Sequence, residues 1–355
     1  MKARLRASLC HFAGAYQLDY QLQSELRNPM KAIVIDRPGD ESVLRVGEIL
    51  DPVPGPTDLL IAVRCAALNR ADIVQRQGNY PPPPGAPATL GLECAGIVAA
   101  VGAEVKGWRV GDRVMALLPG GGYAEKAIVQ YGSAMHVPNA LSDEEAAAIP
   151  EVYLTAFLNL FMIAGVKAGQ SVLIHGGGSG VGTASIQLLG EAGARSIVTA
   201  GSDAKCEQCL KFGADVAINY KAGPFAPQVK AATNNRGVDV VLDSIGAAYL
   251  SANLEALAHG GALVLIGMMK GAKTELDLTT ILRRHLRIYG STLRTRPVAE
   301  KAQIVAAFLE RFGPALEAGR LRPPIYKVLP LEESAEAHRL MQASEHFGKI
   351  VLRVS

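Results

Sequence analysis

The clearest chemical pattern in the chain is a glycine-rich turn at residues 176–182, Gly-Gly-Gly-Ser-Gly-Val-Gly. The apolar segment 171–175 runs into this turn, and residues 181–191 follow it with helical spacing. Glycines let a backbone turn sharply and approach a pyrophosphate, while a helix N-terminus offers N–H groups and a positive dipole end. The strict Gly-x-Gly-x-x-Gly spacing would place glycine where the chain has Ser179, whose hydroxyl can itself donate to phosphate. The turn therefore predicts a dinucleotide site, with contacts from Gly178, Ser179, Gly180 and Val181.

A second set of residues bears on which dinucleotide binds. An NAD site usually has an acidic residue at the end of the second strand, but here this strand ends Ala200-Gly201-Ser202, with Lys205 close behind. A small neutral turn followed by a cation favours the extra 2′-phosphate of NADPH, and Tyr220, after the third strand, can cover the same phosphate. Asp203 is interpreted as a first-turn acid behind a Ser202 N-cap. The alternative is that Lys205 is an ordinary surface lysine.

The elements around these residues change character near residue 150. Before it, the chain has β-rich runs and turn signals, with strands predicted at 31–36, 59–66, 95–101 and 110–116. Ser142 and Glu145 fit a capping box, and a further helix is expected at 151–164. Strands at 171–175, 196–200, 216–219, 238–242 and 262–266 then alternate with helices, which indicates a doubly wound parallel sheet. After a long helix at 298–318, residues 324–355 read as strand, helix and strand, which we expect to return to the first domain.

Composition limits the classes of protein to consider. A chain of 355 residues with 49% hydrophobic residues suits two well-buried domains. The net charge of +3 gives no argument for nucleic acid or a membrane surface, and no apolar run is long enough to span a membrane. Five scattered cysteines do not suggest a disulfide framework, so we expect reduced thiols and a cytoplasmic protein. Residues 1–29 are expected to be a disordered extension or an early start, with a targeting peptide as the alternative.

Two other patterns that could carry chemistry are weaker. Cys206 and Cys209 have redox or metal spacing, but they fall within a predicted helix with no second pair to complete a zinc site. We therefore expect structural cysteines. His175 and His259 lie in or beside predicted strands, and we expect packing roles for both.

From Met30 to its end, the chain resembles the medium-chain dehydrogenase/reductases, in their zinc-independent quinone oxidoreductase (zeta-crystallin-like) branch. The matching segments are 67–72 (Ala-Leu-Asn-Arg-Ala-Asp), 75–81 (Gln-Arg-Gln-Gly-Asn-Tyr-Pro), 91–96 (Gly-Leu-Glu-Cys-Ala-Gly), 110–114 (Val-Gly-Asp-Arg-Val), 117–122 (Leu-Leu-Pro-Gly-Gly-Gly), 154–156 (Leu-Thr-Ala), 218–220 (Ile-Asn-Tyr) and 348–351 (Gly-Lys-Ile-Val). The resemblance implies an α/β fold in which a GroES-like, β-rich domain (30–150 and 293–355) contains an inserted Rossmann domain (151–292). It agrees with the β-rich start and the returning end of the chain.

The resemblance also assigns roles to residues. Zinc alcohol dehydrogenases of this superfamily have a catalytic cysteine at the position of Asn69 and a ligating histidine at that of Leu92, so no metal is expected here. Asn69 and Tyr80 are implied to lie near the nicotinamide and the acceptor, as catalytic residues. A contact of Tyr80 with the prolines at 81–84 is the alternative. The cofactor contacts implied are those of Thr155, Ser179, Gly180, Val181, Gly201, Ser202, Lys205, Tyr220, Gly267 and Met268.

Without a Lewis acid to polarise an alcohol, hydride transfer favours an acceptor that is already electron-poor. The expectation is therefore an NADPH:quinone oxidoreductase, a homodimer joined through sheet edges of the Rossmann domains, with no nucleic-acid or membrane partner. An enone or enoyl-thioester reductase of the same fold is the first alternative. A protein that binds NADPH without turnover is the second.

Overall fold

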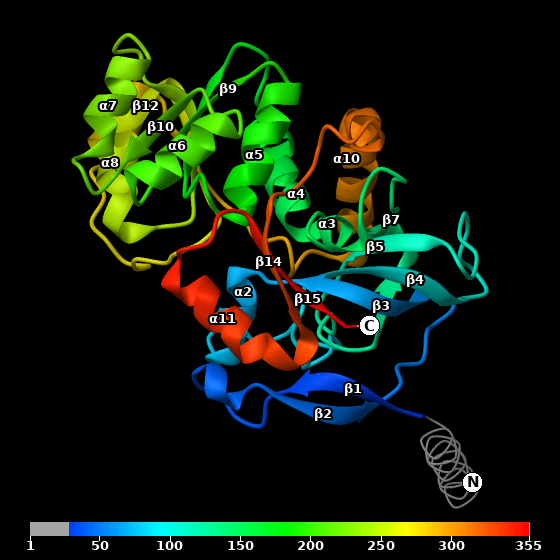
Figure 1. Ribbon diagram of the computed structural model, residues 1–355. Coiled ribbons are helices and arrows are strands. Elements are labelled where there is room, and N and C mark those ends of the chain that lie inside the picture. The colour runs from blue at the N-terminus through cyan, green and yellow to red at the C-terminus, as the bar shows by residue number, and fades with distance from the viewer. Residues whose placement is uncertain (1–27, 355) are drawn as a thin grey trace, which may run out of the picture.

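The computed structural model describes residues 28–354, which form two units built on separate large sheets (Figure 1). The predicted extension, residues 1–29, lies outside the described residues except for its last two positions, and Pro29 already begins the first strand. In Figure 1 the later part of the chain, coloured green to yellow, forms the upper left unit. The blue and cyan early strands lie below it together with the red C-terminal segment.

The later unit is built on a six-stranded parallel sheet. Its strands are β8 (Ser171–His175), β9 (Arg195–Ala200), β10 (Val216–Asn219), β11 (Val238–Asp243), β12 (Leu257–Leu265) and β13 (Arg287–Gly290). They lie in the order β10-β9-β8-β11-β12-β13, which in chain order is 3-2-1-4-5-6, as in a Rossmann fold. All five residues of β8 are buried, as expected for a strand covered on both faces. The predicted doubly wound parallel sheet is confirmed.

Helices connect these strands and cover the sheet (Figure 1). They are α4 (Pro150–Phe157), α5 (Gly180–Glu191), α6 (Asp203–Lys211), α7 (Phe225–Ala232), α8 (Leu250–Ala256) and α9 (Leu278–Arg284). Each right-handed β-α-β connection makes the next strand run parallel to the last. The turns that follow the strands therefore all lie at the carboxyl ends of the strands.

The earlier unit has a mainly antiparallel sheet of seven strands. They are β3 (Asp58–Ala67), β4 (Glu93–Val101), β5 (Arg113–Leu117), β6 (Lys126–Gln130), β7 (Ala134–His136), β14 (Ile325–Pro330) and β15 (Lys349–Arg353). The order is β14-β15-β3-β4-β5-β7, with β6 also paired to β3. β15 runs antiparallel to β3, with Val351 opposite Ala67, so the chain end returns to the first sheet. A separate hairpin of β1 (Pro29–Val34) and β2 (Arg45–Leu50), and helices α2 (Arg70–Arg76), α3 (Asp143–Ala147) and α11 (Ser334–Ala343), complete this unit.

An aromatic cluster packs the long helix α10 (Val298–Glu317) against α4. The Phe157 ring lies 5.7 Å from that of Phe308 and 5.9 Å from that of Phe312, both edge-on. All three side chains are buried, and the core formed around them includes residues of both sheets. The two units therefore share one apolar core at the level of α4.

Local sequence signals predicted several element ends. The Ser142 capping box is present, since Ser142 N–H donates to the Glu145 carboxylate at 2.9 Å and Glu145 N–H donates to Ser142 Oγ at 3.2 Å. The predicted helix 151–164 is present, but its geometry changes along its length: α4 ends at Phe157 and residues 158–163 form a π-helical turn. Asn159 Nδ2 donates to the Thr155 carbonyl oxygen at 2.8 Å, and this side-chain bond competes with the α-helical backbone bond.

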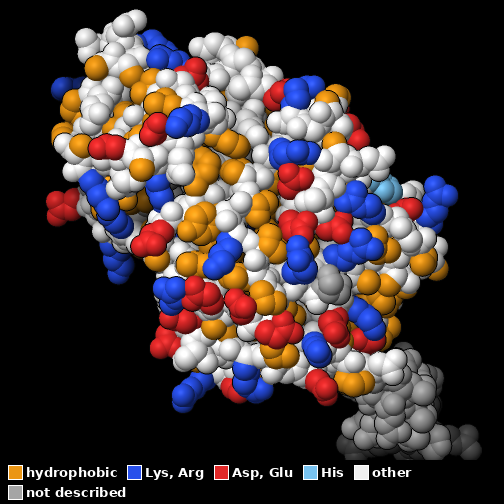
Figure 2. Space-filling model, viewed as in Figure 1, with side chains coloured by type: hydrophobic (Ala, Val, Ile, Leu, Met, Phe, Trp, Pro, Cys, Tyr) orange, Lys and Arg blue, Asp and Glu red, His pale blue; other side chains and the backbone are white. Residues whose placement is uncertain are grey.

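On the face shown in Figure 2, basic and acidic side chains are interspersed rather than gathered by sign. This face therefore has no basic stripe of the kind that follows a nucleic-acid backbone. Within residues 28–354, no helix has the length and apolar character needed to cross a membrane.

Candidate active site

The glycine-rich turn joins β8 to α5. Ser179 caps α5, since its Oγ accepts a hydrogen bond from the backbone N–H of Gly182 at 3.0 Å, and its own hydrogen can still donate outward. A Cβ on Gly182 would lie only 2.3 Å from the carbonyl oxygen of Gly176, so glycine is needed for the helix to pack on the turn. The turn thus combines a positive helix end with the close backbone approach that a pyrophosphate requires.

The C-terminal segment of the GroES-like unit lies directly on this turn. The backbone N–H of Gly348 donates to the carbonyl oxygen of Gly178 at 2.8 Å. A Cβ on Gly178 would lie 3.1 Å from the Phe347 ring, and one on Gly180 would lie 2.7 Å from Cδ of Lys349. The candidate coenzyme site therefore lies where the two units meet.

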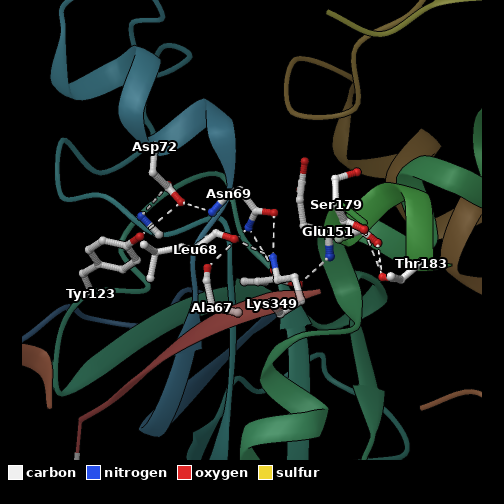
Figure 3. A network of polar contacts seen from close by, with 12 residues as sticks. Ala67, Leu68, Asn69, Asp72, Tyr123, Glu151, Ser179, Thr183 and Lys349 are labelled. Carbon is white, nitrogen blue, oxygen red and sulfur yellow. Dashed lines mark hydrogen bonds and ion pairs between the residues drawn. The ribbon is translucent and has the colours of Figure 1, made fainter. Parts of the chain in front are cut away.

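A buried polar network begins at Lys349 and spans the junction (Figure 3). Lys349 Nζ donates to Glu93 Oε1 at 2.7 Å, to Asn69 Oδ1 at 2.9 Å and to the Leu68 carbonyl oxygen at 2.6 Å. Asn69 Nδ2 donates to the same Glu93 oxygen at 2.9 Å. Both ends of the Asn69 amide are thus engaged within the protein. In this arrangement Asn69 positions Lys349 and Glu93, while its implied place near the nicotinamide and the acceptor stays a prediction.

Asn69 is itself oriented by Asp72, in the first turn of α2. The backbone N–H of Asn69 donates to Asp72 Oδ2 at 2.8 Å, and Tyr123 Oη donates to the same oxygen at 3.2 Å. Burial raises the pKa of Asp72 to about 6, while hydrogen bonds from the Asn69 and Gly91 N–H groups work against that rise. The segment 67–72 is therefore held from both ends by buried polar contacts.

Glu151 lies between this network and the glycine-rich turn (Figure 3). Its backbone N–H donates to Glu93 Oε2 at 2.8 Å, while the next residue, Val152, would touch a Cβ on Gly180 at 2.9 Å. Its Oε2 is inaccessible to solvent and has no hydrogen-bond partner within residues 28–354. Burial raises the pKa of Glu151 to about 8, and the nearby Glu93 carboxylate adds to the rise. Glu151 is thus a largely protonated carboxyl group at neutral pH.

Tyr80 is half-buried. The Arg294 guanidinium lies 5.2 Å from the centre of the Tyr80 ring, within cation–π range. Burial raises the pKa of Tyr80, and Glu151 adds to this rise while Arg294 opposes it. Tyr80, Arg294 and Glu151 therefore surround one region beside the coenzyme turn.

Residues predicted to hold a 2′-phosphate come together at the end of β9. A Cβ on Gly201 would lie 2.8 Å from Tyr220 Oη, so the phenol lies directly over this glycine. Ser202 caps α6, with its Oγ accepting from the Lys205 N–H. Asp203 Oδ1 accepts from Asn219 Nδ2 at 2.8 Å, which agrees with its interpretation as a first-turn acid.

The ammonium group of Lys205 points to the C-terminal segment. Its Nζ donates to the carbonyl oxygens of Ser344 and His346, the latter at 3.0 Å. Lys270, which the sequence analysis did not consider, lies over the Tyr220 ring at 5.9 Å. Two cations therefore flank the turn at Gly201, one from the helix after β9 and one from the loop after β12.

Two of the remaining predicted cofactor residues, Gly267 and Met268, lie at the carboxyl end of the same sheet. Gly267 follows β12, and a Cβ there would lie 3.0 Å from the carbonyl oxygen of Ser244, just after β11. Met268 is 64% exposed, and Thr155 is half-buried in α4. Gly267 and Met268, like the turns at Ser179 and Gly201, follow carboxyl ends of parallel strands, where ligands bind in open α/β sheets.

The chemistry of the donor set does not suit zinc. Leu92 is buried and apolar, and the Asn69 amide is occupied by Lys349 and Glu93. Within residues 28–354, no group of three or more His, Cys, Asp or Glu side chains is arranged to hold a metal ion.

The structure also describes the surroundings of the cysteine pair and the two histidines noted in the sequence. Cys206 and Cys209 are buried free thiols in α6. His175 is buried and hydrogen-bonded to Thr199 Oγ1 at 3.0 Å and Asn253 Oδ1 at 2.7 Å, as a packed residue would be. The packing role expected for His259 is wrong, because this residue is exposed and contacts only the edge of the His285 ring among the aromatic side chains described.

Besides Lys270, sequence reasoning missed Glu93, Glu151, Arg294 and Lys349. Glu93 and Lys349 stand inside the recognised segments 91–96 and 348–351, so that signal was available. Glu151 and Arg294 carry no local signal, because their burial and neighbours depend on the tertiary fold.

Family models match both parts of the chain. Residues 55–139 match the alcohol dehydrogenase GroES-like domain, and residues 180–311 match the zinc-binding dehydrogenase domain. The chain belongs to the medium-chain dehydrogenase/reductase family, among proteins similar to the quinone oxidoreductases. It is an oxidoreductase with a GroES-like domain and a Rossmann domain.

Relatives of two kinds, quinone oxidoreductases and polyketide synthases, match about nine-tenths of the chain. Quinone oxidoreductase from Sus scrofa is 32% identical over 91% of this chain and 97% of its own length. A mycocerosic acid synthase-like polyketide synthase from Mycobacterium tuberculosis is 35% identical over 90% of this chain, but the chain spans only 15% of that protein.

The similar solved structures also include both quinone oxidoreductases and enoyl reductases. A Pseudomonas syringae pv. tomato quinone oxidoreductase has a TM-score of 0.83 at 28% identity, covering 92% of this chain and 100% of its own. A mycobacterial protein complexed with NADPH has a TM-score of 0.81 at 29% identity, and an enoyl reductase has 0.81 at 28%; both cover 92% of this chain and 100% of their own.

Proposed function

We propose that this protein is an NADPH-dependent, zinc-independent quinone reductase. The observation that carries the proposal is the environment of Asn69 and Leu92, where an engaged amide and a buried alkyl group offer no Lewis acid for an alcohol or aldehyde. An acceptor that is already electron-poor needs no such polarisation. A flat quinone also suits the half-buried ring of Tyr80, on which it can stack.

The residues present fit a nicotinamide dinucleotide. Ser179 and the start of α5 would bind the pyrophosphate, while Gly201, Ser202 and Tyr220 would bind the adenosine ribose end. Cations at Lys205 and Lys270, with no acidic side chain ending β9, favour a 2′-phosphate and therefore NADPH. When bound, the reduced nicotinamide supplies a hydride to the acceptor.

The chain's own groups orient the reactants and control their surroundings. The Lys349–Glu93–Asn69 network would hold the backbone beneath the site in place. Its charges are buried, so they would not face the acceptor. Tyr80 forms one wall, and Gly267 and Met268 lie at the end of β12 where the nicotinamide would face.

The activity test is steady-state NADPH oxidation with matched panels of acceptors. We expect 1,4-benzoquinone and 9,10-phenanthrenequinone to give kcat/KM values well above those of simple enones and enoyl thioesters. Higher kcat/KM values for enones or enoyl thioesters would instead support the alternative function, an enoyl reductase, which one of the similar solved structures has as its name. Tight NADPH binding without oxidation by any acceptor would instead indicate a binding protein.

We also propose that two copies pair through the edge of the Rossmann sheet. β13 is the last strand on that side, and within residues 28–354 nothing pairs with its outer edge. Around this edge Leu278 and Leu282 are 69% and 75% exposed, and Ile288 is 36% exposed. An apolar sheet edge of this kind is a ready template for a second copy.

A further inference from the structure

Arg294 is 3% exposed, yet much of its hydrogen-bonding capacity is unused. Its Nε donates to the carbonyl oxygen of Pro119 at 2.8 Å. Neither Nη1 nor Nη2 has a hydrogen-bond partner within residues 28–354. A buried charged donor without a partner is costly, so such a group indicates a ligand or solvent that completes it.

The surroundings of Arg294 place it in the acceptor region. Its guanidinium lies over the Tyr80 ring, and the Glu151 carboxyl is close enough that its ionisation would affect the pKa of Arg294. Arg294 follows β13, so it reaches this region from the carboxyl edge of the parallel sheet. It is thus a buried cation beside the aromatic ring proposed to stack on the acceptor.

The turn 119–121 lies against this guanidinium. A Cβ on Gly120 would lie 3.5 Å from Arg294 Nη2 and 2.7 Å from the carbonyl oxygen of Pro87. Glycine therefore lets the turn pack on residues 87–89 while Pro119 still accepts from Arg294 Nε. This gives a physical reason for glycine at position 120.

We propose that Arg294 binds the carbonyl oxygen of the acceptor and stabilises the negative charge that forms on the acceptor during reduction. The proposal rests on the reductase function proposed above and names a specificity-determining residue for it. A planar guanidinium with two free N–H edges suits an oxygen that gains charge, and it contributes most where water is excluded.

The reaction balances with the groups named. The acceptor takes up a hydride and one proton, and NADPH is oxidised to NADP⁺. The electron pair of the hydride leaves an oxyanion, an enolate or phenolate, on the acceptor, and a proton from solvent converts it to a hydroxyl. Glu151 does not neutralise Arg294 as a carboxylate would, because burial and Glu93 raise the pKa of Glu151 to about 8.

The test uses 4-nitrophenol as an oxyanion probe, since its phenolate is coloured and its binding does not depend on turnover. With the protein saturated with NADP⁺, we expect wild type to lower the pKa of bound 4-nitrophenol. Arg294→Met should weaken phenolate binding by about 10- to 100-fold, as expected for a hydrogen bond to a charged group. Arg294→Lys should keep part of the effect, because it retains the charge without the planar fork.

Kinetics provide a second readout. Arg294→Met should lower kcat/KM for 1,4-benzoquinone by about 10²- to 10³-fold, the usual effect of removing an oxyanion donor. The KM for NADPH should change less than about twofold, because Arg294 is proposed to contact only the acceptor. The matched control is Arg311→Met in α10, which removes an exposed guanidinium that lies 4.2 Å from the centre of the Phe161 ring.

The possible outcomes are distinct. Equal phenolate affinity in folded Arg294→Met, Arg294→Lys, Arg311→Met and wild-type protein, judged by circular dichroism and Tm, would overturn the proposal. A third outcome is that wild type reduces no quinone, while Arg294→Met weakens phenolate binding and Arg311→Met does not. The oxyanion site then stands and the quinone reductase function fails. If Arg294→Met is unfolded, the graded response of Arg294→Lys decides in its place, and an unchanged response there counts against the proposal.

Discussion

Lys349 Nζ lies 2.7 Å from Glu93 Oε1, although the two side chains are only 2% and 0% exposed and stand 256 residues apart in the chain. The pair links the last strand of the protein to β4, directly beside the coenzyme turn. Such a pair repays its desolvation only when further hydrogen bonds complete it, and here Asn69 and the Leu68 carbonyl oxygen do so.

Lys349→Met should lower the free energy of unfolding by about 3–5 kcal/mol, because it leaves the Glu93 carboxylate buried and uncompensated. The double variant Lys349→Met/Glu93→Gln should recover much of this loss. The exposed pair of Arg353 and Glu144 is the control, and Arg353→Met should destabilise the protein far less than Lys349→Met. Urea denaturation of the four proteins measures these differences; equal losses in the single and double variants would contradict the role of the pair.

Two glycines in α5 should respond to alanine in opposite directions. Gly182→Ala would place a methyl group 2.3 Å from the Gly176 carbonyl oxygen, so we expect about 1–3 kcal/mol of destabilisation and weaker NADPH binding. Gly190 has open space around its Cβ position, so Gly190→Ala should stabilise the helix by about 0.5 kcal/mol. Thermal unfolding and NADPH titration by fluorescence measure both effects, and similar NADPH affinity in the two variants would argue against coenzyme binding at this turn.

The stability of the protein should depend on pH through Glu151. Burial raises the pKa of Glu151 to about 8, well above the value of about 4.3 for an unfolded chain. Between these values the folded state binds more protons than the unfolded state, so Glu151 makes stability fall as pH rises from 5 to 8.

Glu151→Gln removes this titration while keeping the shape. The stability of Glu151→Gln relative to wild type should therefore grow by on the order of 3 kcal/mol between pH 5 and pH 8, since each pKa unit is worth about 1.4 kcal/mol. The neighbouring charges of Glu93, Lys349, Asp72 and Lys301 are present in both proteins. Urea denaturation at several pH values gives the difference, and a constant difference would show that Glu151 is already ionised in the folded protein.

Lys205 should distinguish the two coenzymes. Lys205→Met is expected to raise the KM for NADPH about tenfold or more, because a charged hydrogen bond to the 2′-phosphate is lost, and to leave the KM for NADH nearly unchanged. The control is Lys221→Met, which removes a cation from the neighbouring turn. Equal effects on both coenzymes would mean that Lys205 only holds the Ser344 and His346 carbonyl oxygens.

The proposed pairing of Rossmann sheets predicts a mass of two chains in solution. Light scattering with size-exclusion chromatography should show a dimer for wild type and a monomer for Ile288→Lys, since a charge on the edge strand opposes pairing. Val110→Lys, on an exposed residue of the other unit, is the control and should remain dimeric. A monomeric wild type would remove the proposal.

Local sequence signals determined much of the fold. The glycine-rich turn after β8, the Ser142 and Ser202 caps and the alternation of buried strands with helices each depend on residues a few positions apart. These features arise from backbone geometry and short-range hydrogen bonds, which sequence patterns report directly. The helix predicted at 151–164 is also present, but its change from α to π geometry after Phe157 has no counterpart in the hydrophobic pattern. It is accompanied by the side-chain bond of Asn159 to the Thr155 carbonyl oxygen.

The sequence by itself determined the family, the coenzyme turn and the absence of zinc-type ligands at Asn69 and Leu92. Only the tertiary structure decided what the polar groups of the site do. It placed Lys349 against Glu93 and engaged both ends of the Asn69 amide. It also left the buried Arg294 without partners for its terminal nitrogens. These outcomes depend on burial and on contacts between distant segments, because the same side chain is a solvated surface charge in one fold and a binding group in another.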